Sequence, residues 1–187
     1  MTTSEANFRN WFVTSLAPLR TNGDAGFIFV LTAFPLLERY LRRKSSCPEG
    51  QDLTPAFFTN LGSLFTDIAG YEREFWNCYR NGLLHQVTFS RAKFDKRKGI
   101  WVTLPEAGLS GYDPRPVYFL PSQAQFYLNP ISFFDAIVSA ILGDFATYEG
   151  IPNTHYNLPS LLDPAGAVPH IVPTINFNLP KTGPETS

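Results

Sequence analysis

Apolar side chains recur every three or four positions in four stretches of the chain, at about residues 4–21, 25–44, 54–84 and 130–150. This spacing gathers them on one face of a helix, where they can be buried together. Hydrophobic residues make up 44% of the chain and include 17 Phe, so there is ample material for a packed core. The sequence therefore predicts a mainly α-helical domain of four to five helices over residues 1–150.

Local signals mark where these helices begin and where they are interrupted. Pro35 lies inside the second helix and is expected to kink it. Glycines predict at least one break in the third helix, at Gly62, Gly70 or Gly82. Short polar side chains that can accept hydrogen bonds from a first helical turn stand at the expected helix starts, namely Thr3 or Ser4, Asp24 and Asn129.

A β-hairpin is expected as an insertion at about residues 87–104. Residues 87–94 alternate between apolar and polar, residues 95–99 favour a turn, and residues 100–104 are rich in strand-forming side chains. Residues 117–120 can add a short strand. The rest of this region is expected to be irregular because of its prolines, Pro105, Pro114, Pro116 and Pro121.

The composition changes at residue 151. Residues 151–187 contain seven prolines and almost no charge, yet apolar side chains persist there. This pattern differs from that of a simple polar linker. We expect an extended Pro-rich tail that packs along the domain or against a partner.

Basic side chains are concentrated in the first half of the chain. Residues 1–100 hold 13 Lys and Arg against 9 Asp and Glu, a net charge of +4, whereas residues 101–187 have a net charge of −5. A polyanion would therefore meet the first half. The alternative is that each basic cluster is a solvated helix end or hairpin tip. The clusters are Arg39, Arg42, Arg43 and Lys44, and then Arg91, Lys93, Lys96, Arg97 and Lys98.

Several features predict a cytoplasmic protein without membrane attachment. The first ten residues are polar and include Glu5, unlike a secretion signal. The most apolar stretch, residues 27–37, is shorter than the roughly 20 residues of a membrane-spanning helix. Cys47 and Cys78 lie far apart in the sequence and are expected to be reduced.

No metal or cofactor is expected from the sequence. It contains no glycine-rich loop of the kind that cradles phosphates, and its carboxylates show no spacing that suggests a catalytic pair. The histidines and cysteines lack the close ligand pairs of a structural zinc site. The histidines are His85, His155 and His170.

One segment combines side chains with recognisable chemistry. Arg80, Asn81 and His85 follow an aromatic-rich helical stretch. An imidazole titrates near neutral pH and can transfer a proton, and a guanidinium offers a planar fork of donors to a phosphate. The segment resembles the signature of the HEPN superfamily, helical-bundle domains with an arginine, a polar residue and a histidine four to six positions after the polar residue. The resemblance covers about residues 24–86 and 130–150.

The resemblance implies a homodimeric, metal-independent endoribonuclease of a defence, toxin or stress pathway. In nuclease members of the family the products carry a 2′,3′-cyclic phosphate and a 5′-hydroxyl. His85 would then be the general acid or base, Arg80 the phosphate clamp and Asn81 an orienting partner. Under this hypothesis the candidate RNA-binding residues are Arg42, Arg43, Lys44, Arg91, Lys93, Lys96, Arg97 and Lys98.

Other interpretations remain open from the sequence. On an ideal α-helix Arg80 and His85 point about 140° apart, at roughly 100° per residue. Arg80 can instead pair with Glu72 or Glu74, while His85 acts as a favourable cation at a helix end. The domain would then be a non-catalytic module that binds a protein or a nucleotide, or a purely structural dimer.

Overall fold

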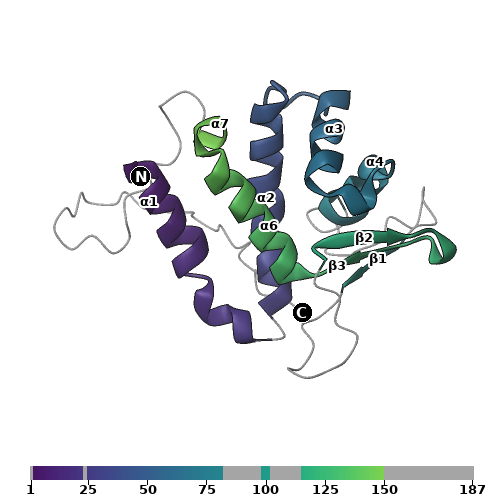
Figure 1. Ribbon diagram of the computed structural model, residues 1–187, viewed down its shortest axis with the longest axis horizontal. Helices are drawn as coiled ribbons and strands as arrows, with labels where there is room; N and C mark the ends of the chain where they lie inside the picture. The colour runs from purple at the N-terminus through teal and green to yellow at the C-terminus, as the bar shows by residue number, and fades with distance from the viewer. Residues whose placement is uncertain (1, 23–24, 82–97, 102–114, 150–187) are drawn as a thin grey trace, which may run out of the picture. The chain divides into compact units, whose positions relative to one another are not determined.

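The chain divides into two compact units, Met1–Tyr156 and Asn157–Ser187. All the residues that the computed structural model describes belong to the first unit. They are residues 2–22, 25–81, 98–101 and 115–149 (Figure 1). The expected Pro-rich tail, residues 151–187, lies outside them.

Within these ranges helices predominate, which confirms the predicted mainly α-helical class. A small three-stranded sheet accompanies them. The α-helices are α1 (Thr3–Phe8), α2 (Gly26–Lys44), α3 (Pro55–Leu64), α4 (Glu72–Trp76), α6 (Pro130–Gly143) and α7 (Phe145–Glu149). The strands are β1 (Lys98–Trp101), β2 (Val117–Leu120) and β3 (Gln125–Leu128).

The first helical segment begins with a polar cap. The Oγ1 atom of Thr2 accepts a hydrogen bond of 3.1 Å from the backbone N–H of Glu5, so the cap lies just before the expected positions. After α1 the chain winds as a π-helix, η1 (Arg9–Thr14), and then as a 3₁₀-helix, η2 (Ala17–Thr21). The segment therefore ends close to Asn22, as predicted.

Helix α2 continues through Pro35 and ends at Lys44, the end that was predicted, while the kink expected at Pro35 stays a prediction. Its expected cap, Asp24, lies outside the described residues. Three cations in its last turn suit the negative end of the helix dipole. Among the helices of the described ranges, none is both long enough and apolar enough to cross a bilayer.

The third helical region is interrupted, as its glycines predicted. Thr54 caps α3, and Gly70, with φ of +84°, separates the short 3₁₀-helix η4 (Thr66–Ile68) from α4. Gly62 has a different role, because it lies buried inside α3 with the Glu72 carboxylate packed against its Cα. A side chain at position 62 would collide with that carboxylate.

The sheet has the strand order β1-β3-β2. Strand β3 pairs in parallel with β1 and antiparallel with β2. The antiparallel pair is linked by the 3₁₀-turn η6 (Pro121–Gln123) and by Ala124, which adopts a left-handed backbone conformation with φ of +49°. On one face of this pair the rings of Tyr118 and Tyr127 stack, with centroids 5.0 Å apart.

The hairpin that the structure describes is β2–β3, and not the one expected at residues 87–104. Lys98 and Gly99, expected in the turn of that hairpin, lie in β1, where they pair with residues of β3. The remainder of the expected hairpin, residues 87–97 and 102–104, is outside the described residues. Strand β2 was predicted. Strand β3 was missed, although Phe126 and Leu128 alternate with polar neighbours and are buried.

The last helical region consists of two helices instead of one. Asn129 caps α6 by accepting a hydrogen bond of 3.1 Å from the N–H of Ser132, as the Asn-Pro pair predicted. The chain then leaves the helical conformation at Asp144, directly after Gly143, before α7 begins. A glycine near a helix end favours this interruption because it gains little from continuing the helix.

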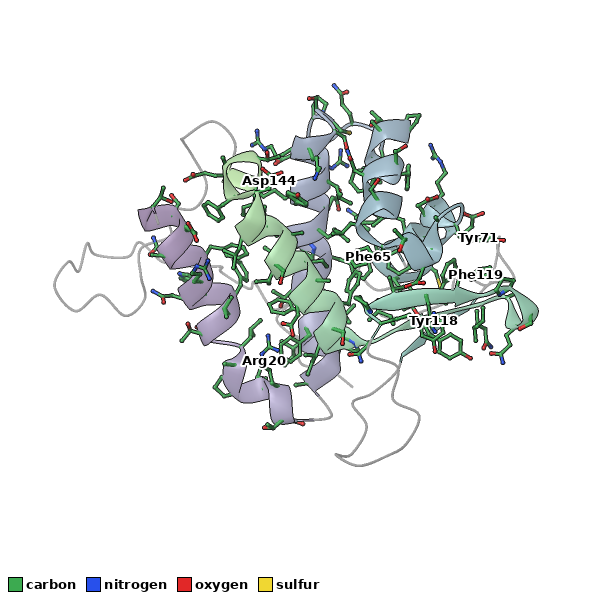
Figure 2. All side chains as sticks on the ribbon, in the orientation of Figure 1. Arg20, Phe65, Tyr71, Tyr118, Phe119 and Asp144 are labelled. Atoms are coloured by element: carbon green, nitrogen blue, oxygen red, sulfur yellow. The ribbon has the colours of Figure 1, made fainter. Side chains whose placement is uncertain are left out.

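Aromatic side chains form the core between α2, α6, α4 and the sheet. Phe34 of α2 lies 5.2 Å from Phe133 and 5.8 Å from Trp76 between ring centroids. The hydroxyl of Tyr79, a buried side chain, donates a hydrogen bond of 2.9 Å to a backbone carbonyl of β3. Figure 2 shows Tyr71 and Phe119 together where the helices meet the sheet, and their ring centroids are 4.2 Å apart. These contacts fix the turn that carries Arg80.

Candidate functional site

Arg80 lies in the last described turn of the region that follows α4. This turn, η5 (Asn77–Asn81), is π-helical, so its hydrogen bonds join residues five positions apart. Tyr79, which precedes Arg80, is fully buried and bonded to the sheet. The neighbouring Arg80 is held at the edge of the core, where 24% of its side chain is exposed.

The guanidinium of Arg80 is paired with Glu38 of α2. Its Nε and Nη2 atoms donate hydrogen bonds of 3.0 and 2.8 Å to Oε2 of Glu38. The other carboxylate oxygen of Glu38, Oε1, accepts a bond of 3.0 Å from Nε of Arg42. One carboxylate, with 17% of its side chain exposed, therefore bridges two arginines.

Arg42 is also the centre of a network that closes the loop after α2. Its Nη1 atom donates to the carbonyl oxygens of Pro48 at 2.9 Å and Gln51 at 3.0 Å, and it lies 3.3 Å from Sγ of Cys47. Only 12% of the Arg42 side chain is exposed. Most of its donors are thus directed to the protein itself.

The next two basic residues differ from Arg42. Lys44 donates a hydrogen bond of 3.1 Å to the hydroxyl of Tyr40. This bond, aided by the charge of Asp144, raises the pKa of the Lys44 ammonium above its ordinary value. Arg43 is exposed, and its guanidinium makes no hydrogen bond or ion pair with the described part of the chain.

An open pocket of about 420 Å³ lies beside Arg80. Its wall combines charge with aromatic surface, because Arg73 stacks over the ring of Phe58 at 4.2 Å and Trp76 lies next to them. Both aromatic residues are buried, with 9% of Phe58 and 3% of Trp76 exposed, so a ligand in this pocket would meet mainly its charged groups. The lining residues that carry a charge are Glu38, Arg42, Asp52, Arg73 and Arg80.

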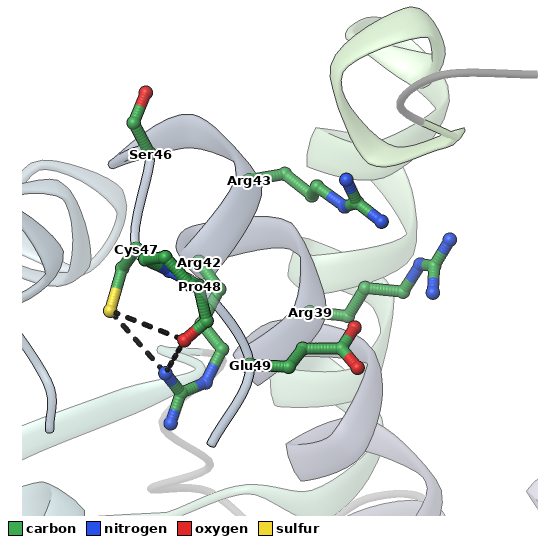
Figure 3. A pocket seen from close by; sticks show the side chains of 7 residues that line it. All are labelled: Arg39, Arg42, Arg43, Ser46, Cys47, Pro48 and Glu49. Atoms are coloured by element: carbon green, nitrogen blue, oxygen red, sulfur yellow. Dashed lines mark hydrogen bonds between the residues drawn. The ribbon is translucent and has the colours of Figure 1, made fainter. Parts of the chain in front are cut away.

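A second pocket, of about 540 Å³, lies at the carboxyl end of α2. It is lined by Arg39, Arg42 and Arg43 together with four residues of the following loop, Ser46, Cys47, Pro48 and Glu49 (Figure 3). Arg42 belongs to the wall of both pockets. The two pockets are therefore adjacent.

Several residues of the predicted site are not among those whose side chains the structure describes. Asn81 ends the π-helical turn, and Lys98 begins β1, but only their backbone is described. The others lie outside the described residues altogether. They are His85, Arg91, Lys93, Lys96 and Arg97.

Sequence reasoning missed Glu38 as the partner of Arg80. The alternatives named were Glu72 and Glu74, which are close to Arg80 in the sequence. Glu72 instead accepts a hydrogen bond of 2.9 Å from the N–H of Gly70. The position of Glu38 four residues before Arg42 signals the pairing of those two residues on one side of a helix, but it does not point to Arg80.

Among the described residues, no group of three or more His, Cys, Asp and Glu side chains converges as a metal site would require. Comparison of the chain with protein-family models, with curated proteins and with solved structures finds no match.

Proposed function

We propose that this protein is a HEPN-like, metal-independent endoribonuclease whose site contains Arg80, Asn81 and His85. The observation that carries the proposal is the guanidinium of Arg80 at the rim of a pocket lined by three arginines and two aromatic rings. A pocket of about 420 Å³ falls within the range of roughly 300–1,000 Å³ that is typical of small-molecule sites. It has room for one nucleotide.

The chemistry assigns a task to each group. The 2′-hydroxyl oxygen attacks the adjacent phosphorus while His85 accepts its proton, and the bond from phosphorus to the 5′-oxygen breaks. The departing 5′-oxygen takes a proton from water, which leaves a 2′,3′-cyclic phosphate and a 5′-hydroxyl. Arg80 stabilises the negative charge that develops on the non-bridging oxygens. Glu38 is a positioning residue: its carboxylate accepts two hydrogen bonds from the guanidinium of Arg80 and so holds its orientation.

The π-helical winding before the motif also supports the proposal. Arg80 and His85 are five positions apart, a spacing that an ideal α-helix places on different faces. Hydrogen bonds in a π-helix join residues five apart, and π-helical turns occur often at functional sites. The turn Asn77–Asn81 is wound in this way up to the start of the motif.

The test is RNA cleavage by the purified protein in the presence of EDTA. Wild type is expected to release fragments ending in a 2′,3′-cyclic phosphate, identified by mass spectrometry. His85→Ala should lower the rate by about 10²- to 10⁴-fold, the usual contribution of a general acid or base. Arg80→Lys should also be strongly impaired, because an ammonium lacks the planar fork.

Arg9→Gln is the matched control, since Arg9 is exposed, pairs with the nearby Glu5 and lines neither pocket. It should cleave like wild type. Equal rates for wild type and His85→Ala would remove His85 from the mechanism. Cleavage that EDTA abolishes would contradict a metal-independent reaction. Light scattering of the protein as it leaves a size-exclusion column gives its molar mass, and a homodimer should have twice the mass of one chain.

A second candidate function is a non-catalytic module that binds a protein or a nucleotide. The ion pair between Arg80 and Glu38 favours it, because a guanidinium already matched by a carboxylate can serve structure alone. On this hypothesis the apolar Pro-rich tail docks on a partner. Deleting residues 151–187 should then abolish partner capture while RNA cleavage is undetectable in every variant.

A further inference from the structure

The pocket at the carboxyl end of α2 has a strongly positive lining. Three of its seven lining residues are arginines, and its one acidic residue is Glu49. Figure 3 shows Arg39 and Arg43 extending from α2 in the same direction. A cationic ligand would meet three guanidiniums here, so the lining favours an anion.

The arginines of this pocket have different tasks. Arg42 is directed inward to Glu38 and to the loop, and it builds the floor. Arg39 is held against Tyr148, with its Cζ 5.4 Å from the ring centroid, and its Nε donates to the Tyr148 carbonyl at 3.3 Å. Arg43 is exposed and makes no ion pair within the described residues.

In this pocket Arg39 is held in place, whereas the guanidinium of Arg43 has no hydrogen bond or ion pair among the described residues. Cation–π contact fixes Arg39, whereas Arg43 can turn its planar fork toward a phosphate without breaking a contact. The carbonyl groups at the end of a helix oppose an anion, but their partial charge is about half an elementary charge. The guanidiniums of Arg39 and Arg43, with a formal charge of +2, outweigh this partial charge and the single negative charge of Glu49 together.

We infer that this pocket is a phosphate-binding subsite for an RNA strand, with Arg43 as its principal contact. The inference rests on the proposed function, since the strand is the proposed substrate. Arg42 lines both this pocket and the one that contains Arg80. A strand with one phosphate at Arg80 therefore has a positively lined path for a flanking phosphate.

Binding is measured by fluorescence anisotropy with a labelled 12-nucleotide RNA whose 2′-hydroxyls are all methylated, so that the proposed reaction cannot occur. Arg43→Gln should raise the Kd roughly three- to tenfold and lower the slope of log affinity against log salt by about 0.7. Glu49→Gln should lower the Kd by about two- to threefold, because a like charge is removed. Arg9→Gln is the control, because it removes one positive charge, as Arg43→Gln does, but at a site outside the pocket.

Arg43→Gln should fold normally, as circular dichroism will verify, because the guanidinium of Arg43 contacts no described residue by hydrogen bond or ion pair. An unchanged Kd and slope for Arg43→Gln, or a loss that Arg9→Gln matches, would overturn the subsite. Failure of wild type to bind the RNA would overturn it as well. Cleavage of unmodified RNA is scored separately, so a protein that binds through Arg43 but does not cleave loses the nuclease proposal and keeps the subsite.

Discussion

The carboxylate of Glu38 is the contact whose removal should have the largest effect around Arg80. Glu38 accepts three hydrogen bonds from Arg80 and Arg42, at 2.8 to 3.0 Å. Glu38→Gln preserves the shape of the side chain but removes its charge, and it replaces one acceptor oxygen by an NH₂ group. That group would face a guanidinium, so at least one arginine loses its partner.

The expected cost follows from the exposure of the three side chains. A hydrogen bond to a charged group contributes about 1.5–3 kcal/mol when it is buried, and a fully exposed ion pair at most about 1 kcal/mol. Here the exposed fractions of the side chains are 12% for Arg42, 17% for Glu38 and 24% for Arg80. The three side chains are therefore neither fully buried nor fully exposed. We expect about 1 kcal/mol for each arginine, a loss of about 2 kcal/mol in the free energy of unfolding.

Urea unfolding followed by far-ultraviolet circular dichroism measures this loss. In thermal unfolding of a chain of this length, the same loss should lower the Tm by about 4–8 °C. Glu5→Gln is the control, because Glu5 pairs with Arg9 at the surface, where 44% of the Arg9 side chain is exposed, and it should cost less than about 0.5 kcal/mol. A loss for Glu38→Gln no larger than that of the control would refute the bridging role of Glu38.

Three further substitutions test the packing around the site. Gly62→Ala should change the free energy of unfolding by less than about 1 kcal/mol, because the better helix propensity of alanine is offset by the shift that its Cβ imposes on the Glu72 carboxylate; a gain of the full ~1 kcal/mol would show that the carboxylate moves at no cost. Tyr79→Phe should cost about 1–2 kcal/mol in urea unfolding by leaving the carbonyl of Phe126 without its buried donor, and a neutral effect would count against that bond. Asn129→Ala should cost about 1 kcal/mol, with Asn129→Ser recovering most of it if capping is the cause.

The parts of the fold that the sequence predicted depend on local chemistry. Asn129 before a proline and the cations at the end of α2 act within one helical turn, so the pattern alone locates the helix boundaries they mark. The glycine at position 70 adopts a positive φ, as a break requires. Each of these residues determines the backbone conformation within about one helical turn of itself.

The errors arise where distant segments decide the outcome. Lys98 and Gly99 look like turn residues, but pairing with β3 extends them into a strand. The turn before β3 uses Ala124 in a left-handed conformation that alanine seldom adopts, so no glycine or asparagine marked it. Arg80 reaches Glu38 across 42 positions of the sequence, a pairing that no local rule contains.

Trp76 gives the protein an optical reporter of its own. Its ring packs edge-on against Phe57 at 4.9 Å, while the residue also lines the pocket that contains Arg80. Indole emission responds to nearby charge and to water, so a nucleotide entering this pocket should change the emission of Trp76 without any attached dye. The spectral difference between wild type and Trp76→Phe isolates that signal from the other tryptophans, and a titration then reads occupancy of the pocket directly.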